Sequence, residues 1–162
     1  MKNISIALLF LLSFNVLSFK LTPMSYSIIG GSQKKNIATF TVSNDSDVSI
    51  AVQLEVKVRS MKVDGSEVLP ETDEFLVFPD QLVLAPKSRR VVKVRWTKGE
   101  VKDIERSFRL IAEQLPIDMN KKKDTKTDIK ILLRYVAALY VTPKKTKSGV
   151  KVLTSEASKD LK

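Results

Sequence analysis

The sequence predicts an all-β sandwich, because strand-like segments separated by turns recur along it without a long amphipathic helical pattern. Two segments alternate most clearly. In residues 36–43, Ala38, Phe40 and Val42 alternate with polar residues. In residues 48–58 the apolar positions are Ile50, Val52, Leu54, Val56 and Val58. Alternation of this kind indicates strands with one buried face and one face in water.

The remaining elements follow from turns and prolines. We expect further strands at residues 19–29, 75–86, 89–96, 107–116 and 128–143, which makes about seven. Pro23 interrupts the first of them, which places it at a sheet edge or a bulge. Trp96 is expected to anchor the edge of the core. Asp64-Gly65 predicts a turn, and residues 101–106 are read as a short helical turn.

The last predicted strand, residues 128–143, divides into two parts. Ile129, Ile131 and Leu133 share one face, whereas residues 135–141 are almost unbroken apolar, as in a strand covered on both sides. An exposed aliphatic row beside unpaired backbone favours pairing with another chain. Two alternatives are that the row makes a homodimer through this edge, or that it packs against the domain's own second sheet.

The ends of the chain differ in composition from the middle. Residues 1–18 hold one early lysine and a short apolar run, which is typical of a secretory signal peptide, with an uncleaved anchor as the alternative. Residues 19–143 then form one domain, and residues 144–162 a basic tail that is disordered or adds one strand. The signal and the absence of cysteine favour the periplasm.

The composition argues against an enzyme. The chain contains no histidine and no cysteine, which removes the commonest general base, the commonest metal ligand and thiolate chemistry. Its acidic clusters lack the spacing of a calcium loop. We therefore expect no catalytic residues, no metal, no cofactor and no small-molecule substrate.

Positive charge is the other marked property of the chain. The formal net charge is +10, with lysine-rich runs at residues 121–123 and 143–147. These runs are solvated loops, or they hold anionic polymer or attract acidic partners. Nucleic acid is disfavoured by export and by the lack of aromatic residues within the basic runs.

Several segments, in order, resemble the first domain of the periplasmic pilus-assembly chaperones, the PapD-like family. Residues 107–116 (SFRLIAEQLP) are close to the pattern S/Y-R-L-x-x-E-x-L/I-P, the most specific piece. Residues 78–95 resemble the pattern P-x-x-x-x-L-x-P-G-x-x-x-x-V-R-V. Residues 19–25 and 134–143 resemble the first strand and the core half of the last strand. The resemblance implies an immunoglobulin-like sandwich over residues 19–143.

The resemblance also implies a partner and a way to bind it. In that family the last strand lends alternating aliphatic side chains to an incomplete pilus subunit, completing the subunit's own sandwich. By alignment these donor positions fall on Ile129, Ile131 and Leu133. The expected partner is therefore a secreted pilin-like or other surface subunit, bound by β-strand addition.

Two departures from the family pattern concern charged anchors and length. The family's arginine and lysine for the subunit carboxylate align with Ser25 and Ala138, neither of which can supply a charged hydrogen bond. Arg134 and Arg109 are the candidate substitutes. Only 19 residues follow Pro143, so we expect a stand-alone first domain or a fragment of a two-domain protein. The alternative to a chaperone function is that the protein is a structural or adhesive protein of the cell envelope.

Overall fold

The computed structural model describes residues 19–32, 34–117, 131–145 and 149, and within them the chain is all-β. The strands, in order, are β1 (Phe19–Thr22), β2 (Ser25–Ile29), β3 (Ile37–Asn44), β4 (Ile50–Val58), β5 (Ser60–Met61), β6 (Glu67–Val68), β7 (Phe75–Phe78), β8 (Gln81–Leu84), β9 (Ser88–Trp96), β10 (Arg106–Gln114) and β11 (Arg134–Thr142). The predicted fold class is confirmed.

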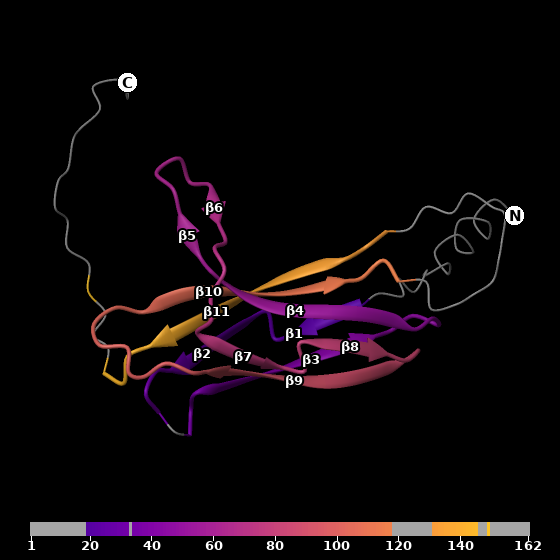
Figure 1. Ribbon diagram of the computed structural model, residues 1–162, viewed down its shortest axis with the longest axis horizontal. Coiled ribbons are helices and arrows are strands. Elements are labelled where there is room, and N and C mark those ends of the chain that lie inside the picture. Colours follow the sequence, from indigo (N-terminus) through magenta and orange to yellow (C-terminus); the bar gives the residue numbers. More distant parts are fainter. Residues whose placement is uncertain (1–18, 33, 118–130, 146–148, 150–162) are drawn as a thin grey trace, which may run out of the picture.

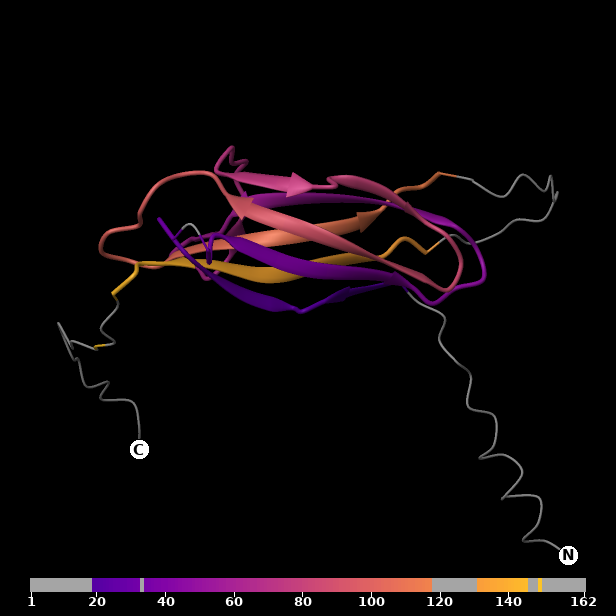
Figure 2. The ribbon, with the colours of Figure 1, turned by 90° about the horizontal axis from the view of Figure 1, so that it is seen from below.

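Two sheets pack face to face and form the sandwich. The four-stranded sheet has the order β1-β3-β9-β7, and the five-stranded sheet has the order β2-β11-β10-β4-β8. Figure 1 shows β3 and β9 in one layer below β4 and β10, and Figure 2 shows the strands of the layers crossing at a shallow angle. Strands β5 and β6 form a small hairpin that stands away from the sandwich (Figure 1).

The difference between about seven expected strands and eleven observed ones has two sources. The first expected strand is divided between the sheets, because β1 pairs with β3 and β2 pairs with β11. Likewise, β7 pairs with β9 and β8 pairs with β4. Each division falls at a proline, Pro23 or Pro79, which has no N–H to donate to a ladder. The hairpin β5–β6 supplies the other two strands.

The core lies between the two sheets and follows the predicted alternation. Ala38, Phe40 and Val42 of β3 are fully buried, as are Leu139 and Val141 of β11. Trp96 is 3% exposed, and its indole N–H donates to the Gly99 carbonyl at 2.8 Å, so its expected place at the core edge is confirmed. A side chain with one polar atom needs such a partner when it is buried.

The expected helical turn over residues 101–106 is wrong. Residues 101–105 are irregular and Arg106 already begins β10. Val101 packs against the hydrophobic core, which pins this segment across the end of the sandwich. A Cβ added to Gly30 would come within 3.0 Å of the Val101 side chain, so the glycine permits this close approach. Tertiary packing here overrides a local preference.

The last strand is shorter than expected. It begins at Arg134, while residues 128–130 lie outside the described part. The ladder with β10 ends where the Gln114 N–H donates to the Leu133 carbonyl at 3.0 Å. The next amide, Leu115, donates instead to Ala51 of β4 at 2.8 Å. Residues 131 and 132 therefore precede the strand without a backbone partner among the described residues.

Two turns at one end of the sandwich are joined by a buried side chain. The Asn44 amide nitrogen donates to the carbonyls of Val48 at 2.7 Å and Ala85 at 3.0 Å, and Asn44 is 0% exposed. Its Oδ1 accepts from the Ser46 amide at 3.0 Å. Every hydrogen-bonding direction of this amide group is used, as a buried polar group requires.

Candidate functional site

The expected donor residues lie where the sandwich ends. Ile131 is 76% exposed, Leu133 is half-buried against the core, and Ile129 falls outside the described residues. Both described residues precede Tyr135 at intervals of two, and Tyr135 begins the inward-facing series of β11, while residues 131–133 themselves lie outside the strand. The Tyr135 ring meets the Phe19 ring edge-on, with centroids 5.0 Å apart, and its hydroxyl donates to the Phe19 carbonyl at 2.6 Å. Phe19 is the first residue of β1, so the described part of the opposing sheet begins at this level.

The two positions aligned with the family's charged anchors lie side by side. In the parallel pair of β2 and β11, Ser25 is opposite Ala138, and the Ala138 amide donates to the Met24 carbonyl at 2.9 Å. Ser25 is exposed and Ala138 is half-buried. Neither side chain carries a charge, so this pair cannot by itself hold a carboxylate by ionic hydrogen bonds.

Two cations on the neighbouring strands β10 and β4 lie in line with the Ser25–Ala138 pair. Arg109 of β10 is opposite Ala138, and Lys57 of β4 is opposite Arg109. The row across the outer face of the five-stranded sheet is therefore serine, alanine, arginine and lysine. Arg134 belongs to the same face but lies four residues before Ala138, about 13 Å along the strand. Of the two candidate substitutes, the structure places Arg109 beside the Ser25–Ala138 pair.

Each cation of this row already has an acidic partner. Arg109 lies 2.9 Å from Glu67 of the hairpin, which also contacts Arg59. Lys57 lies 2.8 Å from Glu71 and 3.2 Å from Glu55. Glu67 and Glu71 thus already pair with these two cations, and an external carboxylate would have to compete with them.

These contacts shift two ionisation equilibria. Partial burial raises the pKa of Glu67, but hydrogen bonds from Arg109 and then Arg59 outweigh it, so the pKa lies below the usual 4.5. Hydrogen bonds to Glu71 and then Glu55 raise the pKa of Lys57 above 10.5. Both shifts favour the charged forms and keep the pairs ionised at neutral pH.

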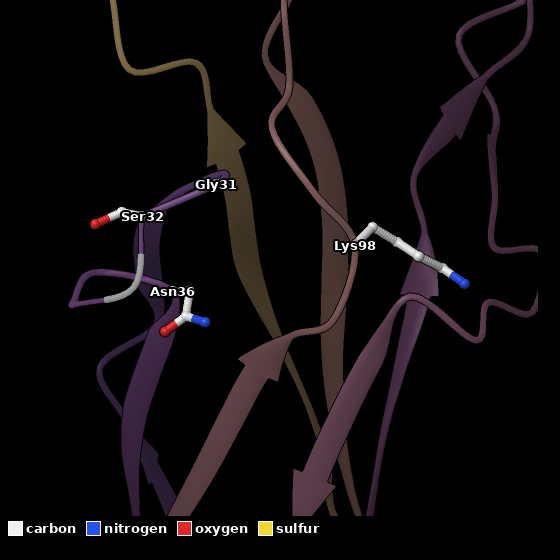
Figure 3. Close-up of a pocket in the computed structure, with 4 residues that line it drawn as sticks. All are labelled: Gly31, Ser32, Asn36 and Lys98. Carbon is white, nitrogen blue, oxygen red and sulfur yellow. The ribbon is translucent and has the colours of Figure 1, made fainter.

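The surface of the described part has hollows on either side of Lys98. One of about 580 Å³ is lined by Val58, Glu71, Thr72, Asp73, Glu74 and Lys98, and another of about 170 Å³ is lined by Gly31, Ser32, Asn36 and Lys98. Figure 3 shows the Lys98 side chain pointing away from the other three, and its Nζ lies 3.1 Å from Asp73. Among the described residues no cluster of acidic side chains could hold a metal ion, and no helix is long and apolar enough to cross a membrane.

Comparison with known proteins identifies the family. A model of the pili and flagellar-assembly chaperone family, PapD N-terminal domain, matches residues 24–147. The chain belongs to this family. Among curated proteins, no sequence matches the chain. The PapD-type match spans all the described strands from the end of the first cis-proline turn through β11.

Solved structures of pilus chaperones share the PapD-type fold at low identity. One is the CsuC–CsuE chaperone–tip adhesion subunit complex of Acinetobacter baumannii, with TM-score 0.65 and 16% identity over 83% of this chain and 61% of that one. Another is the SafA pilin–SafB chaperone complex of Salmonella enterica, with TM-score 0.62, 23% identity and 84% and 59% coverage. The E. coli chaperone DraB gives TM-score 0.60, 22% identity and 82% and 58% coverage. The chain thus spans about three fifths of the length of these structures.

Proposed function

We propose that this protein is a periplasmic chaperone domain that binds a secreted pilin-like or other surface subunit by β-strand addition through residues 129–133. Family membership supports a role in pilus assembly, and several structural neighbours are complexes of a chaperone with a pilin or a tip adhesin. Export by residues 1–18 is part of the proposal, because the subunit has to be met outside the cytoplasm.

The observation that carries the proposal is the exposure of Ile131. A large aliphatic side chain that is 76% exposed lies on a segment with no backbone partner in the described part of the chain. Leu133, two residues later, already contacts the core. In the proposed complex, residues 129–133 would extend β11 and carry its inward row beyond the part that this domain buries, and a groove in a subunit would cover those side chains.

The magnitude of the available burial is sufficient for capture. Burying the three side chains of Ile129, Ile131 and Leu133 is worth roughly 5–9 kcal/mol before ordering costs, at about 1.5–3 kcal/mol each. Because Ser25 and Ala138 are neutral and Arg109 is already paired with Glu67, apolar burial and backbone pairing are the main sources of affinity in this proposal.

The test combines crosslinking with a charge substitution. A photo-crosslinking residue at position 131 of the exported chain should give adducts with a small, strand-rich secreted subunit, identified by mass spectrometry. The variant Ile131→Asp should lose capture of that subunit and keep the parent's melting temperature, because position 131 is exposed. Val63→Asp, on the tip of the hairpin where Val63 is fully exposed, is the matched control and should bind normally.

Three results would contradict the proposal. Adducts formed only between copies of the chain would favour a homodimer through this edge. Unfolding of Ile131→Asp would show that the row is ordinary core. Equal capture by Ile131→Asp and the parent would move the function to a structural or adhesive envelope protein.

A further inference from the structure

The outer face of the four-stranded sheet is defined by the outward side chains of β1, β3, β9 and β7. The strand registers set them in four rows: Lys20–Ser43–Arg89, Thr22–Thr41–Val91, Thr39–Lys93–Phe78 and Ile37–Arg95–Leu76. We call this set the basic face. It contains four cations and no acidic residue, and no part of the proposed subunit-binding segment belongs to it.

The cations of the basic face are largely unpaired. Among the described residues, Arg89, Lys93 and Arg95 form no salt bridge, and Lys20 has one contact of 3.9 Å with Asp45. Strand β10 of the other sheet is as long as β9, but its charged side chains form salt bridges. There Arg106 pairs with Glu74, Arg109 with Glu67, and Glu113 with Arg134. The basic face therefore gathers unpaired cations in register on one sheet, whereas the charged residues of β10 are paired with acidic partners.

Large apolar side chains lie between these cations and are exposed. Phe78 is 72% exposed and directly opposite Lys93, and Leu76 is 56% exposed and directly opposite Arg95. Val91, on β9 between Arg89 and Lys93, is 53% exposed. A face that only had to stay solvated would not need phenyl and aliphatic groups in register with its charges.

We propose that the basic face binds the surface of a membrane that contains anionic phospholipids. Lysine and arginine near such a surface are attracted to its phosphate groups, while aromatic and aliphatic side chains enter the boundary between headgroups and acyl chains. Charge complementarity selects this occupant over a second copy of the chain, since two basic faces brought together would repel each other. The regular pleated rows fit an extended anionic surface.

The experiment measures co-sedimentation of the full chain with lipid vesicles. Vesicles of phosphatidylcholine with one third phosphatidylglycerol should bind the chain, and vesicles of phosphatidylcholine alone should not. Neutralising two cations in Lys93→Gln/Arg95→Gln should weaken binding roughly 25-fold, at about fivefold for each charge. Added salt should weaken binding of the parent steeply.

The matched control is Lys62→Gln/Lys102→Gln. It removes the same net charge from two exposed lysines that also form no salt bridge among the described residues, and it should weaken binding much less. Phe78→Ser tests the apolar part and should reduce the binding that survives at high salt. Melting temperatures of all variants should match the parent, because every substituted side chain is exposed.

Several outcomes would overturn the proposal. Equal losses in the test and control pairs would mean that net charge alone is responsible. Absence of binding to phosphatidylglycerol vesicles would exclude the membrane surface. If the Lys93/Arg95 variant bound vesicles normally but lost an acidic protein partner, the basic face would be a protein-docking surface instead.

Discussion

The two ends of the segment 131–142 differ in what lies across from them. Near its C-terminal end, Ala137, Leu139 and Val141 are fully buried between the two sheets. Near its N-terminal end, Leu133 is half-buried and Ile131 is 76% exposed, although all five residues follow one another at intervals of two in the sequence. The same side-chain pattern is therefore core at one end and available surface at the other. The described part of the opposing sheet covers the first end, since β1 begins at Phe19, whose ring contacts Tyr135.

The largest expected effect comes from the buried end. Leu139→Ala should destabilise the domain by about 3 kcal/mol, because it removes a fully buried side chain and leaves a cavity between the sheets. Chemical denaturation followed by circular dichroism would measure the loss. A loss below about 1 kcal/mol would mean that the buried end is far less tightly packed than the structure indicates.

An intermediate effect is expected at the boundary. Leu133→Ala should cost about 1 kcal/mol, since this side chain contacts the core but keeps part of its surface in water. The same denaturation measurement applies, with Leu132→Ala as the neighbouring control, because Leu132 is 45% exposed and is not among the side chains that pack against the core. Equal losses of unfolding free energy in Leu133→Ala and Leu132→Ala would contradict the view that Leu133 is the position at which burial begins.

A smaller effect is expected from the Arg109–Glu67 ion pair, which lies on the outer face of the five-stranded sheet beside the buried end of β11. Arg109, opposite Ala138, is paired with Glu67, whose pKa lies below the usual value of 4.5. A lowered pKa in the folded state means that this pair contributes stability at neutral pH and that the contribution is lost as pH falls through the folded pKa. Titration of Glu67 by NMR should give a midpoint below 4.5, and Arg109→Gln should move that midpoint upward.

The smallest effect on stability is expected at Ile131. Ile131→Ala should change the free energy of unfolding by no more than about 0.5 kcal/mol, as is usual for exposed positions. Subunit capture should nevertheless fall, which a binding assay alongside the denaturation curve would detect. A cost comparable to that of Leu133→Ala would place Ile131 in the domain's own core and remove the contrast.

Much of the fold could be predicted from the sequence because alternation is a local property. The apolar positions of β4 from Ile50 to Val56 are all buried, and Trp96 lies at the core edge as expected. The prolines indicated where strands are interrupted. They could not indicate that β1 and β2, or β7 and β8, belong to different sheets, because that depends on pairing with strands distant in sequence.

Part of the candidate site could also be predicted from the sequence. Alignment alone paired Ser25 with Ala138, and the strand register places them opposite each other. Register was also needed to add Lys57 and to choose Arg109 over Arg134. The pairing of Arg109 with Glu67 depends on where the base of the hairpin β5–β6 lies relative to β10, for which no local pattern in the sequence gives a signal.

The turn at Lys87 has a consequence for how this end of the domain opens. Lys87 adopts a left-handed backbone with φ of 53°, at a position where the family pattern has glycine. Its Nζ donates to the Asp45 carbonyl at 2.7 Å and its amide to the Ser46 carbonyl at 3.2 Å, while Asn44 reaches back to Ala85. The loops around residues 45 and 86, some forty residues apart in sequence, therefore each donate a side-chain hydrogen bond to the other's backbone. In hydrogen exchange they should behave as one cooperative unit, whose amides become accessible together in a single local unfolding event.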